Sequence, residues 1–221
     1  MSDYSLVAEN VNKTFGRRLI FKDISFKINS STIFGISGPN GSGKSTLVKI
    51  IANIISTSSG KLIHNQNGNE IKPEKLHNHI GLVSPYLVLY DEFTAYENLN
   101  YFSEIRGVSF NKERVDSLLT KFLLFNRKDD FVKTYSSGMK QRLKFIFALM
   151  HSPQLIILDE PTSNLDDEGK EVVYDLIKEE GSKNIVIVAS NEKTDLSLCT
   201  DLIDLKNYKN ESQISKIKFQ I

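Results

Sequence analysis

The sequence is poor in cysteine, in excess charge and in long apolar runs, and each shortage excludes a class of protein. The single cysteine, Cys199, rules out an internal disulfide and suits a reducing compartment, where we expect it to be a small buried apolar residue. The formal net charge is +1, so the total charge gives no indication of a nucleic-acid partner. No run approaches the roughly 20 apolar residues of a membrane span, and residues 1–16 lack the apolar core of a secretion signal. We therefore expect a cytoplasmic chain, for which any role at a membrane requires a separate spanning protein.

What the sequence does contain is a series of short β-branched or aromatic runs, which are typical of strands. Strands are expected at 4–11, 24–28, 31–37, 61–65, 80–84, 155–159, 184–190 and 202–205. The runs at 155–158 and 185–189 are continuously apolar, which indicates strands buried on both faces of a parallel sheet. The early runs alternate more and fit an antiparallel edge layer. The pattern predicts an α/β fold.

Helices are expected at 44–55, at 136–151 with Ser136 as the N-cap, and at 166–181. Residues 85–154, between two expected strands, show only helix and loop patterns, and they are too many for one crossover. We therefore expect a helical subdomain at about 89–151, inserted into a core made of about 1–88 and 152–221. The polar tail at 206–221 is expected to be either an edge strand or a frayed terminus.

Residues 38–45, GPNGSGKS, fit the pattern G-x-x-x-x-G-K-[ST] between an expected strand and an expected helix. Glycines let backbone N–H groups converge on phosphate oxygens, and the helix N-terminus adds donors and partial positive charge. Lys44 is placed to reach the β- and γ-phosphates, and Ser45 to bind Mg²⁺. The alternative is a glycine-rich turn without a binding function in which a lysine occurs by chance, and such a turn seldom has a strand before it and a helix after it. The candidate nucleotide-binding residues here are Gly38, Pro39, Asn40, Gly41, Ser42, Gly43, Lys44, Ser45 and Thr46.

The run LIILD ends in two adjacent acids, Asp159 and Glu160. An acid at the end of a buried strand suits a Mg²⁺ ligand, so we assign that role to Asp159. Glu160 is then free to orient and deprotonate the attacking water. Two solvated acids at a strand end are the alternative, and the nearby phosphate loop argues against it.

Three further segments resemble the nucleotide-binding subunit of an ATP-binding-cassette (ABC) transporter, and the resemblance spans about residues 4–205. YSSGMKQRL, at 135–143, resembles the family signature LSGGQ-x-QR. SNLD, at 163–166, resembles the loop after the catalytic acid, and LYDEFTAYENL, at 89–99, resembles the segment after the glutamine loop. Phe15 aligns with the aromatic residue that stacks on adenine in the family.

The resemblance implies a P-loop NTPase (RecA-like) core that binds ATP and Mg²⁺. It implies that two cassettes, either two copies of this chain or this chain and a homologous one, dimerise head to tail around two ATP molecules. Ser136, Ser137 and Gly138 would then face the nucleotide of the partner. It also implies that the helical subdomain binds a separate transmembrane permease at the inner face of the cell membrane, and the signature looks like that of an exporter.

Four positions depart from the family pattern. Pro85 stands near the place of the loop glutamine, and Asn191 stands at the switch histidine. Ser84 or Tyr86 could replace the glutamine through a hydroxyl, and Asn191 keeps a hydrogen-bond donor but cannot carry charge at neutral pH. Ser137 and Met139 are milder changes, because they keep the backbone donors of the signature.

Glu160, Lys44 and Asn191 are thus the catalytic candidates, and three functions stay open. The first is an ATPase that powers transport, with slow hydrolysis because two polar contacts to the γ-phosphate are changed. The second is an ATP-gated clamp with little or no turnover. The third is a non-transport ABC ATPase that acts on ribosomes or DNA, which the neutral charge and the short chain disfavour.

Overall fold

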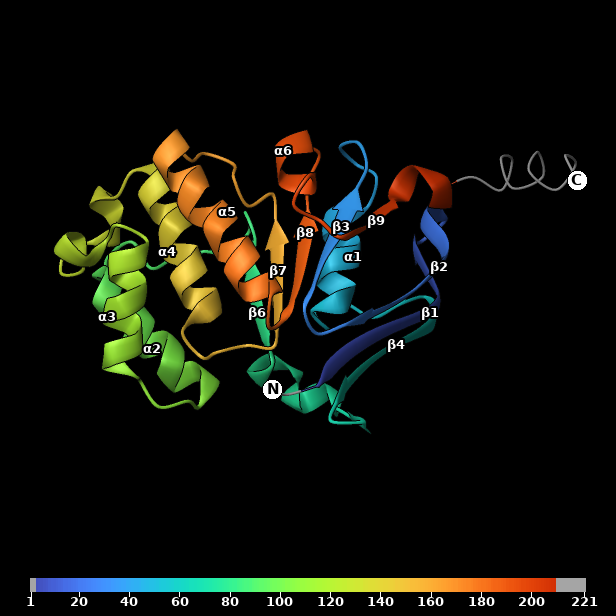
Figure 1. Cartoon of the computed structure of the whole chain (residues 1–221), viewed down its shortest axis with the longest axis horizontal. Coiled ribbons are helices and arrows are strands. Elements are labelled where there is room, and N and C mark those ends of the chain that lie inside the picture. The colour runs from blue at the N-terminus through green and yellow to red at the C-terminus, as the bar shows by residue number, and fades with distance from the viewer. Residues whose placement is uncertain (1–2, 210–221) are drawn as a thin grey trace, which may run out of the picture.

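The computed structural model describes residues 3–209, which form two sheets with helices around them (Figure 1). The prediction for the tail beyond residue 209 lies outside the described residues. Across residues 3–209, no helix has both the length and the apolar composition needed to cross a bilayer.

The first sheet is antiparallel and has the strand order β2-β1-β4-β5. Its strands are β1 (Tyr4–Phe15), β2 (Arg18–Asn29), β4 (Ser59–Gln66) and β5 (Asn69–Glu70). This confirms the expected antiparallel layer, although β1 and β2 are longer than predicted. Register shifts interrupt β1 between Ala8 and Val11 and again near Lys13, and these irregularities hide the alternation by which a long strand is recognised.

The second sheet is parallel and has the order β6-β7-β8-β3-β9. Its strands are β3 (Thr32–Ser37), β6 (Ile80–Val83), β7 (Leu155–Asp159), β8 (Ile185–Ala189) and β9 (Asp201–Asp204). Every residue of β7 and β8 is buried, as their continuous apolar character predicts. The segments that carry chemistry follow β3, β7 and β8, so all three meet at the carboxyl edge of the sheet.

The helices are α1 (Lys44–Ile51), α2 (Ala95–Arg106), α3 (Lys112–Lys121), α4 (Ser137–Leu149), α5 (Asp167–Gly181) and α6 (Lys193–Leu196). Short 3₁₀ turns lie at 73–78, 125–127, 132–134 and 205–208. The caps confirm two predicted helix starts, since Ser136 accepts from the N–H of Met139 at 3.1 Å and Asp166 accepts from that of Gly169 at 3.0 Å. The predicted helix 44–55 is too long, because α1 ends at Ile51 and Asn53 takes a left-handed φ of 56°.

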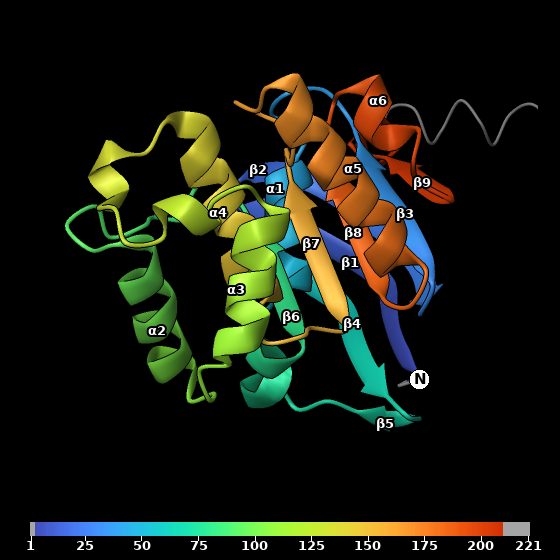
Figure 2. The same ribbon diagram turned by 60° about the vertical axis from the view of Figure 1, so that its left-hand side comes forward.

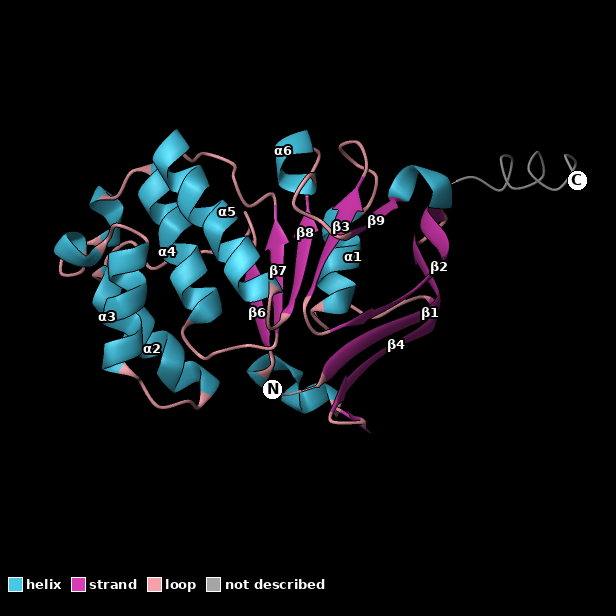
Figure 3. Ribbon diagram, viewed as in Figure 1, coloured by secondary structure: helices cyan, strands magenta, loops and turns pink. Residues whose placement is uncertain are grey.

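The parallel sheet separates two apolar clusters, one on each face. On one face, Ile156 and Leu158 of β7 pack in a cluster with residues of α2 to α5. On the other face, Leu155 and Ile157 pack with α1 and the antiparallel sheet. Figures 1 and 3 show α2, α3 and α4 gathered at one end of the molecule and the antiparallel sheet at the other. Figure 2 shows β7 and β8 beneath α5, with α1 on the far side of the sheet.

Candidate functional site

The phosphate loop joins β3 to α1, and backbone geometry rather than side chains shapes it. Gly38 has a φ of 144°, and a Cβ at this position would lie 2.6 Å from the Ser42 Oγ. Gly43 has a φ of 108°, and its Cβ would lie 2.7 Å from the Cγ2 of Ile20. Only glycine combines these φ values with such close approach, so the loop keeps its N–H groups uncovered for a ligand. The Ser42 Oγ is buried without a hydrogen-bond partner, which fits a loop that closes on an acceptor-rich group such as phosphate.

The first residue of α1, Lys44, is a buried cation beside the phosphate loop. Lys44 is only 6% exposed, and its Nζ donates to the carbonyl of Gly38 at 2.9 Å. The same Nζ lies 3.4 Å from the Oε1 of Glu160. The structure thus brings together the lysine and the acid that the sequence proposes from segments more than a hundred residues apart.

Asp159, at the end of β7, is 1% exposed. Burial raises the pKa of its carboxyl, and a hydrogen bond from Ser45 partly opposes that shift. Its Oδ1 has no hydrogen-bond partner, which is the condition expected of a carboxylate that binds a cation. Residues 3–209 contain no group of three or more His, Cys, Asp or Glu side chains that could hold a metal alone. Asp159 and Ser45 therefore fit Mg²⁺ in its usual form, in which a few protein oxygens share the ion with phosphate and water.

Glu160 occupies a strained backbone position. Its φ is 51°, which is uncommon for a residue other than glycine, and its N–H donates to the carbonyl of Ala189 on β8 at 2.8 Å. This conformation turns the side chain from the strand end toward the phosphate loop. Its Oε1 faces Lys44, and its Oε2 lies 3.4 Å from the Oγ of Ser190.

A cavity of about 480 Å³ lies beside the phosphate loop, and this volume suits a nucleotide. It is lined by Phe15, Arg18, Ile20, residues 40–46, Pro85, Tyr86 and Glu160. Arg18 and Ile20 belong to no sequence motif, because only the pairing of β1 with β2 carries them to the loop. Phe15 is 52% exposed, and the Nζ of Lys13 lies 4.8 Å from its ring centroid, so a lysine partly covers the ring.

Pro85 and Asn191, two of the four departures from the family pattern, both lie near the phosphate loop. Pro85 lines the cavity, and Tyr86 beside it is 68% exposed with the Nζ of Lys49 4.4 Å from its ring centroid. The Ser84 Oγ accepts a hydrogen bond from the backbone N–H of Tyr86 at 3.3 Å, so this hydroxyl oxygen already has a partner two residues along the chain. Asn191 donates from its Nδ2 to the Oδ1 of Asn40 at 3.5 Å, which places it against the phosphate loop.

The signature segment is separate from this cavity. Ser136, Ser137 and Gly138 form the start of α4 and do not line the cavity beside the phosphate loop of the same chain. A Cβ on Gly138 would lie 3.1 Å from the carbonyl of Asn164, so the signature packs against the SNLD loop.

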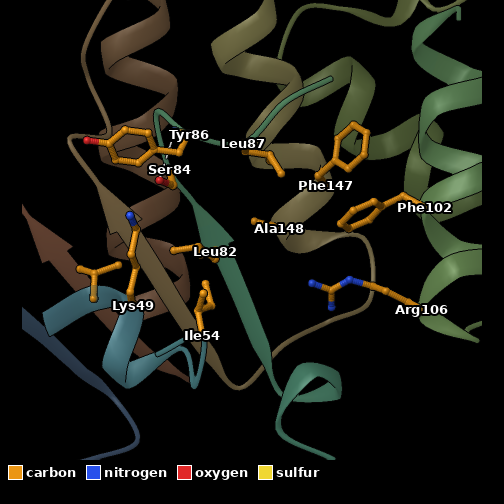
Figure 4. A pocket seen from close by; sticks show the side chains of 11 residues that line it. Lys49, Ile54, Leu82, Ser84, Tyr86, Leu87, Phe102, Arg106, Phe147 and Ala148 are labelled. Atoms are coloured by element: carbon orange, nitrogen blue, oxygen red, sulfur yellow. Dashed lines mark hydrogen bonds between the residues drawn. The ribbon is translucent and has the colours of Figure 1, made fainter. Parts of the chain in front are cut away.

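A second cavity of about 350 Å³ lies where α1 and β6 meet α2 and α4 (Figure 4). Leu82, Phe102, Phe147 and Ala148 give it an apolar lining. Figure 4 shows Tyr86 at its rim above Lys49, with Arg106 across from them. Tyr86 therefore borders both cavities.

Residues 21–163, more than half of the chain, match the family model described as ABC transporter. The linearmycin resistance ATP-binding protein LnrL of Bacillus subtilis is 34% identical over 83% of this chain and 60% of its own length. The lantibiotic transport ATP-binding protein SrtF of Streptococcus pyogenes is 35% identical over 84% of this chain and 79% of its own length.

Among solved structures, a putative ABC transporter ATP-binding protein from Pyrococcus furiosus has a TM-score of 0.80 at 24% identity, covering 93% of this chain and 100% of its own. A bacterial Atm1-family ABC exporter with ATP bound has a TM-score of 0.79 at 20% identity, covering 90% of this chain and 37% of its own. These two likenesses confirm the predicted P-loop NTPase fold. The family match and the relatives together show that the chain belongs to the ABC transporter family, among its ATP-binding proteins.

Proposed function

We propose that this chain binds ATP with Mg²⁺, dimerises around it and hydrolyses it to drive transport through a separate membrane-spanning partner. One observation carries the proposal: the phosphate-loop lysine, Lys44, lies 3.4 Å from the carboxylate of Glu160 at the edge of a nucleotide-sized cavity. A phosphate anchor and a general base are thus adjacent in one site.

Each residue contributes a separate step. The phosphate loop and Lys44 hold the phosphates, and Phe15 stacks on the base. Asp159 and Ser45 hold Mg²⁺, which supplies charge stabilisation at the phosphates when it is bound. Glu160 orients a water molecule and accepts its proton, and Asn191 contributes a hydrogen bond from the opposite side of the loop.

Dimerisation is part of the proposal because the signature residues at the start of α4 do not line the nucleotide-sized cavity of their own chain. Ser136, Ser137 and Gly138 present a helix N-terminus, which favours an anionic group. In a head-to-tail dimer of two copies, or of this chain and a homologous cassette, these residues complete the ATP site of the partner.

The membrane partner is proposed to dock at the second cavity and its rim. Two features of the cavity support this surface, its apolar lining and the cationic side chains of Lys49 and Arg106. The exposed hydrophobic residues Val88 and Ile105, which are 83% and 69% exposed, do not line it but directly follow Leu87 and directly precede Arg106, respectively, in the sequence. The relatives support an exporter, because LnrL is a linearmycin resistance protein and SrtF is a lantibiotic transport protein. Binding to such a partner would hold the chain at the inner face of the membrane.

The docking proposal is tested by Ile105→Ser, with Leu202→Ser at the opposite end of the molecule as the matched control. Both side chains are exposed hydrophobics. Expressed in its own cell, the Ile105 variant should be lost from washed membranes while its ATP binding is kept, whereas the Leu202 variant should stay with the membranes. Recovery of the wild-type chain on ribosomes instead of membranes would favour the non-transport alternative.

Pro85 and Asn191 favour the alternative of an ATP-gated clamp. Two quantities measured on the same sample distinguish the clamp from an ATPase. ATP-dependent dimerisation, followed by size-exclusion chromatography, and phosphate release should both depend on Mg²⁺ for an ATPase. Dimerisation without phosphate release above that of Glu160→Gln would favour the clamp.

A further inference from the structure

Asp195 is a buried carboxylate that belongs neither to the phosphate loop nor to the signature segment. It lies on α6 and is 0% exposed. Three hydroxyl groups donate to it: Thr162 Oγ1 at 3.0 and 3.1 Å to its two oxygens, Tyr174 OH at 3.2 Å, and Ser190 Oγ at 2.7 Å. No lysine or arginine within residues 3–209 forms an ion pair with it. Burying a carboxylate without a cation is costly, so a role in packing alone explains this residue poorly.

The hydroxyls that contact Asp195 come from the segments that build the candidate site. Thr162 lies two residues after Glu160, and Ser190 directly precedes Asn191. The Ser190 Oγ also accepts from the N–H of Glu192 at 3.0 Å, which fixes the turn that carries Asn191. Asp195 therefore ties the loop after β7 to the loop after β8.

Ser190 has a single hydroxyl proton and two acceptors within reach. Its Oγ lies 2.7 Å from the Oδ2 of Asp195 and 3.4 Å from the Oε2 of Glu160. The separation of 2.7 Å is that of an ordinary O–H···O hydrogen bond, whereas 3.4 Å is at the upper limit for one. The Ser190 hydroxyl therefore donates its proton to Asp195. The Oε2 of Glu160 consequently receives no hydrogen bond from this hydroxyl.

We infer that Asp195 is a positioning residue for hydrolysis, which keeps the Ser190 proton away from Glu160 and so leaves that carboxylate free to accept a proton from water. The inference rests on the proposed function, because Glu160 must be the base. It adds a residue, Asp195, and a mechanism, the direction of one hydrogen bond.

The substitution Asp195→Asn tests the direction of that bond, because the amide has the shape of the carboxylate. Its Oδ1 can still accept from Thr162 and Tyr174, but its Nδ2 donates to Ser190. The Ser190 proton then turns to Glu160 and occupies the oxygen that must accept a proton. We expect kcat for ATP hydrolysis to fall about tenfold, with KM for ATP changed by less than about twofold.

The decisive comparison measures the effect of Asp195→Asn on kcat in two further variants, Ser190→Ala and Ser190→Thr. With Ser190→Ala there is no hydroxyl proton to redirect, so Asp195→Asn should change kcat by less than about twofold. With Ser190→Thr, which keeps a hydroxyl, the fall of about tenfold should remain. Ser197→Ala, which removes an exposed hydroxyl two residues from Asp195, is the control and should leave kcat unchanged.

Each result decides the inference. Three results would show that Asp195 is merely structural and would overturn the inference. They are a similar loss of kcat in the wild-type, Ser190→Ala and Ser190→Thr backgrounds, a rise in KM for ATP, and an Asp195→Asn protein that is unfolded by circular dichroism. Wild-type turnover no faster than that of Glu160→Gln would overturn the proposed function, and this inference with it. Wild-type turnover well above that of Glu160→Gln, without coupling between positions 195 and 190, would overturn this inference alone.

Discussion

The Nζ of Lys44 and the Oε1 of Glu160 lie 3.4 Å apart, so the phosphate-loop lysine and the candidate base form an ion pair. In the proposed function, the β- and γ-phosphates of ATP would therefore compete with Glu160 for the lysine. Such a competition would link binding to catalysis, because moving Lys44 to the phosphates would also release the carboxylate that is proposed to accept a proton from water.

This competition predicts that Glu160→Gln binds ATP more tightly than the wild type. The substitution removes both the ion pair with Lys44 and a negative charge beside the triphosphate, and we expect the Kd for ATP to fall about three- to tenfold. Calorimetric titration in magnesium-free buffer measures it without turnover. Lys44→Ala should lose most of the affinity, and an unchanged or weaker affinity in Glu160→Gln would show that the two groups do not compete.

Phe15 is predicted to stack on the adenine ring. Phe15→Ala should weaken ATP binding about five- to twentyfold, the usual value of one base–aromatic stack, while Phe15→Tyr should keep the affinity. Phe131→Ala is the matched control, because Phe131 is also about half exposed and also lies under a lysine, Lys133. Equal losses of affinity in the Phe15→Ala and Phe131→Ala variants would contradict the assignment.

Acid is predicted to destabilise the fold through His64. Burial lowers the pKa of this imidazole to about 4, although the carbonyl of Ile51 partly opposes the shift. Burial also raises the pKa of Tyr4, and the hydroxyl of Tyr4 forms a hydrogen bond of 2.7 Å with the Nδ1 of His64. In the unfolded chain a histidine has a pKa of about 6.5, so the unfolded state binds more protons between pH 6.5 and 4. Stability is thus fully present above pH 6.5 and is lost as the pH falls toward 4.

The measurement is the free energy of unfolding in urea at pH 7 and pH 4.5. His64→Gln should lose about 2 kcal/mol less than the wild type over this range. His77→Gln, at an exposed position, serves as the control and should behave like the wild type. An equal loss in the wild type and His64→Gln would assign the acid sensitivity to other groups, among them His151, whose pKa burial also lowers to about 4.

The departures from the family pattern at Pro85 and Asn191 predict that hydrolysis can be made faster. Pro85→Gln and Asn191→His each restore a side chain that can contact the γ-phosphate or the attacking water. We expect the double variant to raise kcat about tenfold or more, with a smaller effect on KM. Steady-state phosphate release measures this, and a double variant no faster than the wild type would show that these positions do not limit the rate.

Much of the fold was predictable because its signals are local. The continuous apolar runs of β7 and β8 predicted their burial, the capping residue Ser136 predicted the start of α4, and the acids at 166–168 predicted that of α5. The lengths of β1 and α1 were not predictable, since bulges break the alternation of the first and a left-handed Asn53 follows the second.

The candidate site divides in the same way. The phosphate loop and the two acids are contiguous motifs, so their residues could be named from the sequence. Arg18 and Asp195 reach the site only through strand pairing and loop packing, and nothing in their local sequence indicates it. The strained φ of Glu160 is equally invisible in the sequence, because β7 and the hydrogen bond to Ala189 impose it.

The central claim is tested most directly by magnesium-dependent phosphate release, measured for the full chain in its own membranes. The wild type is compared with Glu160→Gln under conditions in which both dimerise equally with ATP. We predict measurable turnover in the wild type that falls at least about a hundredfold in the variant, while both proteins dimerise with ATP. Equal turnover in the two proteins would contradict the assignment of Glu160 as the base, and dimerisation without turnover in either would show that the chain is a clamp rather than an ATPase.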